Sequence, residues 1–325
     1  MKAIVFEKYG SPDVLELKEL DKPVPKDNEV VVRVHASSVN AQEWHFVTGK
    51  PYLVRLSAGL RAPKDTSLGA DLAGVIEAVG SQITEFTPGD EVFGVRWGAF
   101  AEFVRSTGKG LVPKPAKVTF EQAAAVPVAA ITALQGLRDK DKGDLQPGQK
   151  VLVNGAGGGV GHFAVQIAKA LGAEVTGVTK TASVDLVRSL GADHVIDYTK
   201  EDFTKSGKRY DLIFDLGATH SLRELRRVLE PNGTFVQVGA VSMGNFLGPV
   251  SSMLKPKLMG RFVSQKLVSF LAQINKNDLR FLGELLGTGK IKPVIDKTYP
   301  LSQTAEAVRY VLDGHARGKV VIEII

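Results

Sequence analysis

A glycine-rich stretch at residues 154–161, NGAGGGVG, constrains the fold of this chain more than any other segment. It follows a short apolar run and opens an amphipathic stretch that ends near residue 171. In such a loop the first small residue permits a tight turn, the next glycine lets the backbone approach a pyrophosphate, and the last lets the helix pack against the strand. The helix N-terminus adds free N–H groups and a partial positive charge. The spacing therefore predicts a dinucleotide site with contacts from Ala156, Gly158, Gly159 and Val160.

The loop has two other interpretations, of which the first stays open and the second is disfavoured. A glycine-rich turn without a ligand is common in α/β proteins. A nucleoside triphosphate loop would need a Gly-Lys pair followed by Ser or Thr, and none follows here.

The surroundings of the loop predict the fold class. From residue 150 onward, apolar strands alternate with amphipathic helices, which indicates a doubly wound parallel sheet and an α/β fold. Residues 1 to 120 show short strand-like runs punctuated by Pro, Gly and Asp, including runs at 14–20 and 99–104. A last strand at 319–325 needs a sheet to pair with, so we expect the tail to return to the first domain.

Three local signals predict helices outside the alternating region. Asn40 followed by Glu43 fits an N-cap with a capping-box acid, and Thr119 followed by Gln122 fits a second capping box. A third helix is expected at 278–286, because Gly287 follows it.

The segment EVTGVTKTAS at residues 174–183 bears on which dinucleotide binds. An NAD-selective site places Asp or Glu at the end of the second strand, where the acid holds the ribose hydroxyls. Thr179 and Lys180 stand there instead, and a lysine attracts a 2′-phosphate that an acid would repel. We predict NADP(H) bound by Thr179 and Lys180; a solvated loop lysine is the alternative.

Composition excludes several classes of site. The 325 residues contain no cysteine, which rules out disulfides, thiolate-ligated zinc and a cysteine nucleophile. No apolar run reaches the length of a membrane span and no signal-peptide pattern begins the chain, so a cytoplasmic location is expected. The net charge of +6 is spread out, so no nucleic-acid partner is expected, while peripheral membrane contact by basic loops stays open.

Eight stretches together resemble one family. They are ASSVNAQEWHFVTG at 36–49, GADLAGVIEAVG at 69–80, FTPGDEVFG at 86–94, AFAEFV at 99–104, AAAVPVAAITALQGL at 123–137, NGAGGGVGHFAVQIAKALGAEVTGV at 154–178, LGADHVIDY at 190–198 and DGHARGKVVIEI at 313–324. The chain resembles the zinc-free quinone oxidoreductase group of the medium-chain dehydrogenase/reductase superfamily. This implies a GroES-like catalytic domain at 1–124, a Rossmann domain at 125–265 and a return to the catalytic domain at 266–325. It also implies a homodimer through an edge strand near 258–264.

The same comparison addresses zinc. Zinc-dependent relatives carry a cysteine near the first helix and a Gly-His-Glu motif, where this chain has Asn40 and Gly69-Ala70-Asp71. None of the six histidines makes a pair at metal spacing. We therefore expect no metal and no Lewis acid to polarise an alcohol, which leaves reduction of an already electrophilic acceptor.

The resemblance also implies site residues. Asn40 and Thr132 would lie near the nicotinamide, where an N-cap and an ordinary helix threonine are the alternatives. Further cofactor contacts implied are Tyr198, Leu216, Gly217, Val238, Gly239, Ala240, Gly318 and Lys319. For Tyr198 a plain strand-end aromatic, and for Lys319 a solvated lysine, are the alternatives. Many relatives place Ser at the position of Lys180 and a basic residue two positions on, whereas Ala182 stands there in this chain.

These residues imply an NADPH-dependent reductase that transfers hydride to a quinone. Asn40 is a candidate donor to the developing oxyanion, and His45 a candidate proton donor or cleft-lining residue. The acceptor would contact Trp44 and the loops at 50–66 and 241–256. The alternatives are a 2-alkenal or enone double-bond reductase and an NADPH-binding protein with a regulatory or RNA-binding role.

Overall fold

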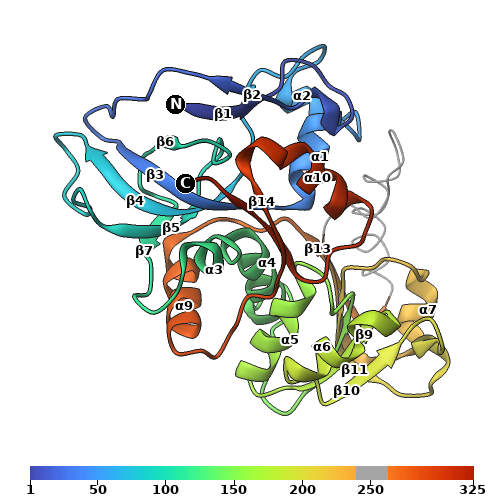
Figure 1. Ribbon diagram of the computed structural model, residues 1–325. Helices are drawn as coiled ribbons and strands as arrows, with labels where there is room; N and C mark the ends of the chain where they lie inside the picture. The colour runs from blue at the N-terminus through green and yellow to red at the C-terminus, as the bar shows by residue number, and fades with distance from the viewer. Residues whose placement is uncertain (239–262) are drawn as a thin grey trace. The chain divides into compact units, whose positions relative to one another are not determined.

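The computed structural model describes residues 1–238 and 263–325, and it divides them into two compact units. Unit 1 comprises residues 1–131 and 274–325, and unit 2 comprises residues 132–273 (Figure 1). The sequence predicts domain boundaries after residues 124 and 265, and these boundaries remain predictions.

Unit 1 is built on a seven-stranded sheet in the order β14-β15-β3-β4-β5-β7, with β6 paired to β3. A small two-stranded sheet, β1-β2, accompanies it. The strands are β1 (Lys2–Val5), β2 (Glu16–Glu19), β3 (Val30–Val39), β4 (Asp71–Val79), β5 (Glu91–Val95), β6 (Phe103–Ser106), β7 (Leu111–Pro113), β14 (Ile295–Pro300) and β15 (Lys319–Glu323). The helices are α1 (Ala41–Thr48), α2 (Val54–Ala58), α3 (Phe120–Ala124), α9 (Lys276–Gly287) and α10 (Thr304–Leu312). The helix α4 (Pro127–Arg138) begins in unit 1 and ends in unit 2.

The tail returns to the first sheet, which confirms that expectation. β15 pairs antiparallel with β3, from Val320 opposite Val39 to Glu323 opposite Ala36. The tail also contains β14 and α10, which the sequence reading missed. β14 reads IDKTYP and contains no fully buried residue, so it lacks the apolar alternation that identifies a strand.

Unit 2 contains a six-stranded, wholly parallel sheet in the order β10-β9-β8-β11-β12-β13. The predicted parallel sheet and α/β fold class are therefore confirmed. The elements are β8 (Lys150–Asn154), α5 (Gly161–Ala170), β9 (Glu174–Thr179), α6 (Val184–Ser189), β10 (His194–Asp197), β11 (Tyr210–Asp215), α7 (Leu222–Arg227), β12 (Leu229–Val238) and β13 (Lys266–Phe270). The strand order reverses between β8 and β11, and ligands of open parallel sheets bind at the carboxyl ends of strands at such a point.

Capping explains where several helices begin. Asn40 precedes α1 with its backbone N–H donating to Glu43, and the Thr119 hydroxyl accepts from the N–H of Gln122 at the start of α3. Both predicted capping boxes are thus present. Pro127 separates α3 from α4, since proline fits the first position of a helix but not its interior.

Two strand predictions in unit 1 were wrong in their bounds. The run at 14–20 begins with a 3-10 turn at Pro12–Val14, and only Glu16–Glu19 forms a strand. The run at 99–104 becomes β6 only from Phe103. Phe100 instead bonds across to a loop, where its backbone N–H donates to Leu68.

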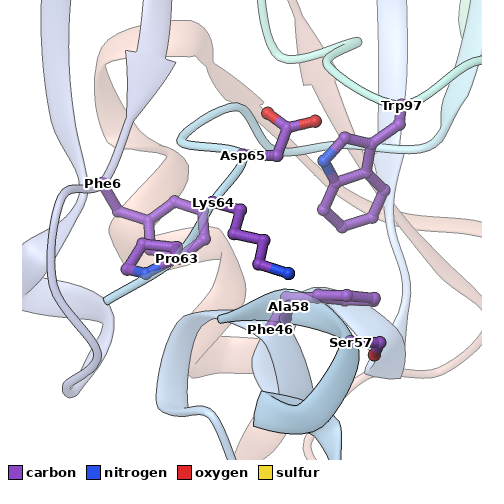
Figure 2. A pocket seen from close by; sticks show the side chains of 8 residues that line it. All are labelled: Phe6, Phe46, Ser57, Ala58, Pro63, Lys64, Asp65 and Trp97. Carbon is purple, nitrogen blue, oxygen red and sulfur yellow. The ribbon is translucent and has the colours of Figure 1, made fainter. Parts of the chain in front are cut away.

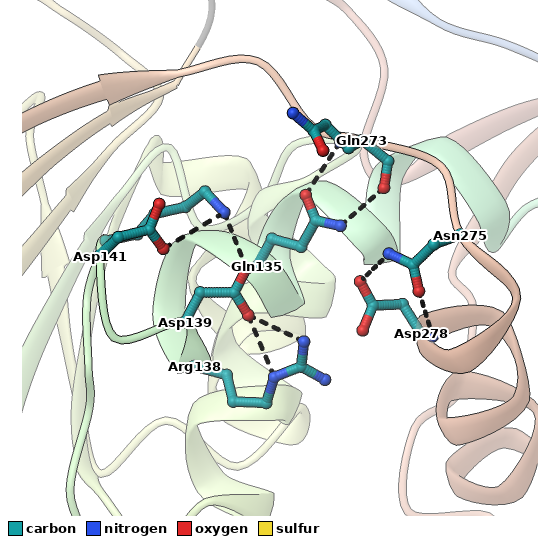
Figure 3. A network of polar contacts seen from close by, with 8 residues as sticks. Gln135, Arg138, Asp139, Asp141, Gln273, Asn275 and Asp278 are labelled. Carbon is teal, nitrogen blue, oxygen red and sulfur yellow. Dashed lines mark hydrogen bonds and ion pairs between the residues drawn. The ribbon is translucent and has the colours of Figure 1, made fainter.

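Polar side chains fix the chain where it leaves unit 2 (Figure 3). The Gln135 amide on α4 donates to the carbonyl of Gln273 at 2.7 Å and accepts from the N–H of the same residue at 3.0 Å. Within unit 1, the Asn275 side chain accepts from the N–H of Asp278 and caps α9. The helix predicted at 278–286 is therefore present, with its start two residues earlier.

Candidate cofactor and active site

The glycine loop of unit 2 makes the tight turn that its sequence predicts. Gly155 has a φ of +91°, a conformation that strongly favours glycine. The N–H groups of Gly155 and Ala156 both donate to the carbonyl of Val178, at 3.1 and 3.0 Å. The end of β8 is thereby joined to the end of β9.

Gly161 and Gly158 meet different surroundings. A Cβ atom at Gly161 would lie 2.0 Å from the carbonyl oxygen of Gly155, so only glycine allows α5 to begin so close to the turn. A Cβ at Gly158 would meet only the Gly155 oxygen, at 3.4 Å, so the space beside Gly158 is otherwise open.

The backbone of the loop also presents donors that the protein itself does not use. Within the part of the chain that the structure describes, the N–H groups of Gly157, Gly159 and Val160 have no hydrogen-bond partner. They lie just before the ten-residue helix α5, whose N-terminus carries partial positive charge. Unpaired amides, open space and a helix N-terminus fit the phosphates of a dinucleotide.

Thr179 and Lys180 stand at the carboxyl end of β9. Thr179 is buried and close to the loop, since a Cβ at Gly157 would lie 2.8 Å from its hydroxyl oxygen. Lys180 follows in extended conformation and begins a 3-10 turn. The structure thus places Thr179 against the glycine loop and Lys180 next to it in the chain.

Asp197 is an acid in this region that the sequence reading missed. It ends β10 directly beside Thr179, and its carboxylate accepts from the hydroxyls of Thr181 at 2.6 Å and Thr199 at 2.7 Å. These hydrogen bonds, led by that from Thr181, lower the pKa of Asp197 to about 2. The signal in the sequence is the strand-end motif His-Val-Ile-Asp, but the cofactor contact predicted there was the next residue, Tyr198. That tyrosine is 54% exposed.

Leu216 and Gly217 lie beside the glycine loop. Leu216 donates its N–H to the carbonyl of Asn154, and a Cβ at Gly155 would lie 3.2 Å from the Leu216 Cβ. The buried carboxylate of Asp215 organises this corner, because it accepts from the Asn154 amide at 2.7 Å and from the N–H of Gly217 at 3.3 Å. Burial raises the pKa of Asp215.

The remaining predicted contacts of unit 2 are less informative. Thr132 lies on α4 and is buried, and Val238 ends β12 and is half-buried. Gly239 and Ala240 lie outside the described residues, as does the loop at 241–256.

Unit 1 contains a polar cluster formed by the buried Glu43, Asp71 and Lys319 and the half-buried Asn40, which we call the Lys319 cluster. The Lys319 side chain is 2% exposed; its ammonium donates to the carbonyl of Val39 at 3.0 Å and to the side-chain oxygen of Asn40, and lies 3.5 Å from an Asp71 oxygen. Burial lowers the pKa of Lys319, while the carboxylates of Asp71 and Glu43 act in the opposite direction. Gly318, which precedes it, has a φ of +88° and packs on Val294.

Asp71 connects the cluster. One oxygen accepts from the Asn40 amide at 2.9 Å and from the Ser38 hydroxyl at 2.7 Å, and the other accepts from the N–H of Val128 at 2.8 Å. The Asn40 amide also lies 3.4 Å from the Ser38 carbonyl. Its oxygen and both its hydrogens are therefore directed to groups within unit 1.

Glu43 completes the cluster from the first turn of α1. One carboxylate oxygen accepts from the N–H of Asn40 at 2.7 Å, and the other is buried without a partner among the described residues. Burial, reinforced by the charge of Asp71, raises the pKa of Glu43 to about 7. The sequence identified Glu43 as a cap and Asp71 as a substituted motif position, but it did not show that the charges of both act on the buried Lys319.

His45 lies on the same helix, half-buried. Its Nδ1 is 2.8 Å from the carbonyl oxygen of Lys50. A carbonyl only accepts, so Nδ1 carries the hydrogen, and Nε2 of the neutral ring is a bare acceptor. No three His, Asp or Glu side chains in residues 1–238 and 263–325 are grouped to hold a metal ion, and no helix there is long and apolar enough to cross a membrane.

A parallel sheet with a phosphate-binding type of glycine turn at its switch point defines a dinucleotide-binding protein. Comparison with known proteins is more specific. Residues 26–116 match the alcohol dehydrogenase GroES-like domain and residues 190–322 match the zinc-binding dehydrogenase family. The chain belongs to the medium-chain dehydrogenase/reductase superfamily, in its quinone oxidoreductase group, and is an oxidoreductase.

Individual relatives agree with this assignment. The chain is 34% identical to a chloroplast envelope quinone oxidoreductase homolog of Arabidopsis thaliana, over 99% of this chain and 98% of that protein. It is 32% identical to an NADPH-dependent alkenal/one oxidoreductase of the same plant, over 99% of this chain and 79% of that protein. A solved quinone oxidoreductase from Escherichia coli, complexed with NADPH, superposes with a TM-score of 0.82 at 26% identity and full coverage of both chains.

Proposed function

We propose that the protein is an NADPH-dependent reductase that delivers hydride to quinones. The observation that carries the cofactor choice is the end of β9, where Thr179 and Lys180 replace the acid of an NAD-selective site. Asp197 lies opposite Thr179 on the neighbouring strand, and its carboxylate accepts from two threonine hydroxyls and lies 3.5 Å from the Lys200 ammonium. In this proposal Lys180 provides the cation for a 2′-phosphate.

The glycine loop holds the pyrophosphate in this proposal. The amides of Gly157, Gly159 and Val160 donate to phosphate oxygens, and the corner formed by Leu216 and Gly217 bounds the site. When bound, the reduced nicotinamide supplies the hydride. The Escherichia coli structure, which holds NADPH, supports this use of the fold.

Unit 1 orients and protonates the acceptor. His45 acts as a proton donor only as the imidazolium, since its neutral ring presents a bare Nε2. Asn40 would have to exchange its bond to Asp71 or Ser38 in order to donate to a substrate oxyanion. Water is the other proton source. The relatives' names favour quinones first and enones second.

We propose that no zinc takes part. The support is the Lys319 ammonium, which occupies the space between Asp71 and Asn40 that a cation would need. Two cations at hydrogen-bond distance from one buried carboxylate would repel each other strongly. A direct contact of Lys319 with the cofactor would likewise require its present hydrogen bonds to be exchanged.

We also propose a cytoplasmic homodimer. β13 is the last strand of its sheet among the described strands, and such an edge can pair with a second copy. The segment predicted to pair, 258–264, lies outside the described residues except for its last two. Light scattering that finds only monomer at micromolar concentration would contradict the dimer, and cell fractionation tests the location.

The decisive experiment is a turnover screen with NADPH and NADH against a panel of quinones and a panel of enones. We expect the highest kcat/KM with NADPH and a quinone. Higher values for enones would assign the enone reductase activity instead. Binding of NADPH with no turnover of either panel would support the regulatory or RNA-binding alternative.

A further inference from the structure

Unit 1 has a pocket that is lined partly by the loop at 50–66, where acceptor contact was expected, but by none of the individual site residues discussed above (Figure 2). Its cavity volume of about 360 Å³ lies within the range of small-molecule sites. The residues that line it come from the segment after β1, from α1, from the end of α2 and the loop that follows, and from the turn after β5: Phe6, Phe46, Ser57, Ala58, Pro63, Lys64, Asp65 and Trp97.

The walls of the pocket are largely apolar and aromatic. Phe6 is fully buried, and the rings of Phe46 and Trp97 meet at a centroid distance of 4.6 Å and an angle of 56°. Pro63 and Ala58 bring further apolar surface toward these rings (Figure 2). Aromatic side chains in such a corner favour stacked or edge-on contact with a flat ring.

The polar groups of the pocket are not equivalent. One Asp65 oxygen already accepts from the N–H and the hydroxyl of Ser67, at 3.0 and 2.6 Å, and the Ser57 hydroxyl donates to the Val54 carbonyl. Lys64 lines the pocket, and its side chain extends into it (Figure 2). Among residues 1–238 and 263–325 its ammonium has neither a hydrogen-bond partner nor an ion pair, so it is the donor available to a ligand.

We propose that this pocket binds the ring of a planar quinone, with the ring against Phe46 and Trp97 and one carbonyl oxygen accepting from the Lys64 ammonium. A hydrogen bond from a charged donor is stronger than one between neutral groups, so Lys64 selects a ring with a carbonyl over a bare hydrocarbon. The inference rests on the proposed function, which supplies quinones as the class of acceptor. The pocket itself is tested by binding alone.

The experiment uses the fact that the chain has two tryptophans, Trp44 and Trp97. In the full-length Trp44→Phe variant, Trp97 is the sole indole, and 1,4-naphthoquinone is titrated without cofactor while its fluorescence is followed. We expect saturable quenching. Lys64→Met should raise Kd about tenfold, and Ala58→Leu, which fills the pocket, should raise it at least as much. Lys64 is exposed, so its variant keeps the test valid if Ala58→Leu fails to fold.

Two controls separate the outcomes. Naphthalene, which has the ring but no oxygen, should bind more weakly and show no response to Lys64→Met. In Trp97→Phe, where only Trp44 reports, quenching should be weaker and should not change when Lys64→Met is added, because Trp44 does not line the pocket. Quenching that stays linear with quinone concentration, or a Kd that neither pocket variant changes, overturns the site while the turnover screen still stands. Saturable binding with no turnover keeps the site and removes the proposed function.

Discussion

The Lys319 cluster of unit 1 and the glycine loop of unit 2 differ in whether their polar groups already have hydrogen-bond partners. In the cluster, the buried Lys319 ammonium and Asp71 carboxylate and the half-buried Asn40 amide are hydrogen-bonded to one another. In the loop, three backbone amides remain without partners in the described chain, next to open space. In the cluster, a donor could bind a ligand only after its present hydrogen bond is broken. In the loop, the backbone N–H groups can bind a ligand as they stand.

This difference indicates how the two sites contribute. A closed polar cluster holds its own atoms in place, because removing Lys319 or Asp71 leaves the other charge buried without its partner. An open loop contributes by what it binds, because its amides gain partners only when a ligand arrives. Substitutions in the cluster should therefore change stability first, and those in the loop should change ligand binding first.

The largest effect is expected from breaking the charge pair of the cluster. Lys319→Met and Asp71→Asn should each lower the free energy of unfolding by about 3–5 kcal/mol, since each leaves one buried charge uncompensated. Both tryptophans lie in unit 1, so their fluorescence during urea unfolding reports on the unit concerned. The double variant should recover much of the loss; a loss equal to the sum of the two would show that the charges are not coupled.

A smaller effect should separate folding from binding within the loop. Gly161→Ala puts a methyl group 2.0 Å from the Gly155 oxygen and should destabilise unit 2 by about 1–3 kcal/mol, or more, through overpacking. Gly158→Ala meets nothing closer than 3.4 Å, so it should keep the fold and weaken cofactor binding. Thermal unfolding and NADPH titration of both variants are the measurements. Equal thermal stability of the Gly161→Ala and Gly158→Ala proteins would contradict the expected difference between a packing glycine and a ligand-facing glycine.

The next effect follows from the raised pKa of Glu43. Between the ordinary value of 4.5 and the folded value of about 7, the folded protein binds more protons than the unfolded chain. Stability should therefore fall as pH rises through this window, by about 1–3 kcal/mol for one such group. Glu43→Gln mimics the protonated acid, so it should match the native protein near pH 4.5 and exceed it near pH 8. The comparison requires urea unfolding of both proteins at both values, and a constant difference between them would contradict the assigned pKa.

The smallest effect concerns cofactor choice. Lys180→Ala should weaken NADPH about tenfold, or about 1.4 kcal/mol, and leave NADH nearly unchanged, because only NADPH carries the 2′-phosphate. Lys150→Ala is a matched control, since Lys150 starts β8 at the opposite end of the sheet. Isothermal titration with both cofactors tests it, and equal losses for NADPH and NADH would end the phosphate role of Lys180.

Much of the nucleotide-binding unit could be predicted from the sequence. Its strands are short apolar runs, its helices follow them at once, and its loop depends on neighbours within a few residues, as in Gly155, Gly158 and Gly161. Local chemistry of this kind is visible in a linear reading. Asp197 could not be recognised as a neighbour of the cofactor site from the sequence, because it lies beside Thr179 only through the pairing of two strands.

The Lys319 cluster shows the limit of that reading. The sequence by itself determined the glycine turn, the capping boxes at Asn40 and Thr119, the absence of cysteine and the return of the final strand. Only the tertiary structure decided that Lys319 is buried against Asp71 and Asn40, which are 248 and 279 residues away in the chain. The physical reason is that antiparallel pairing of β15 with β3, and of β3 with β4, brings these side chains together, and no local periodicity encodes which strands meet.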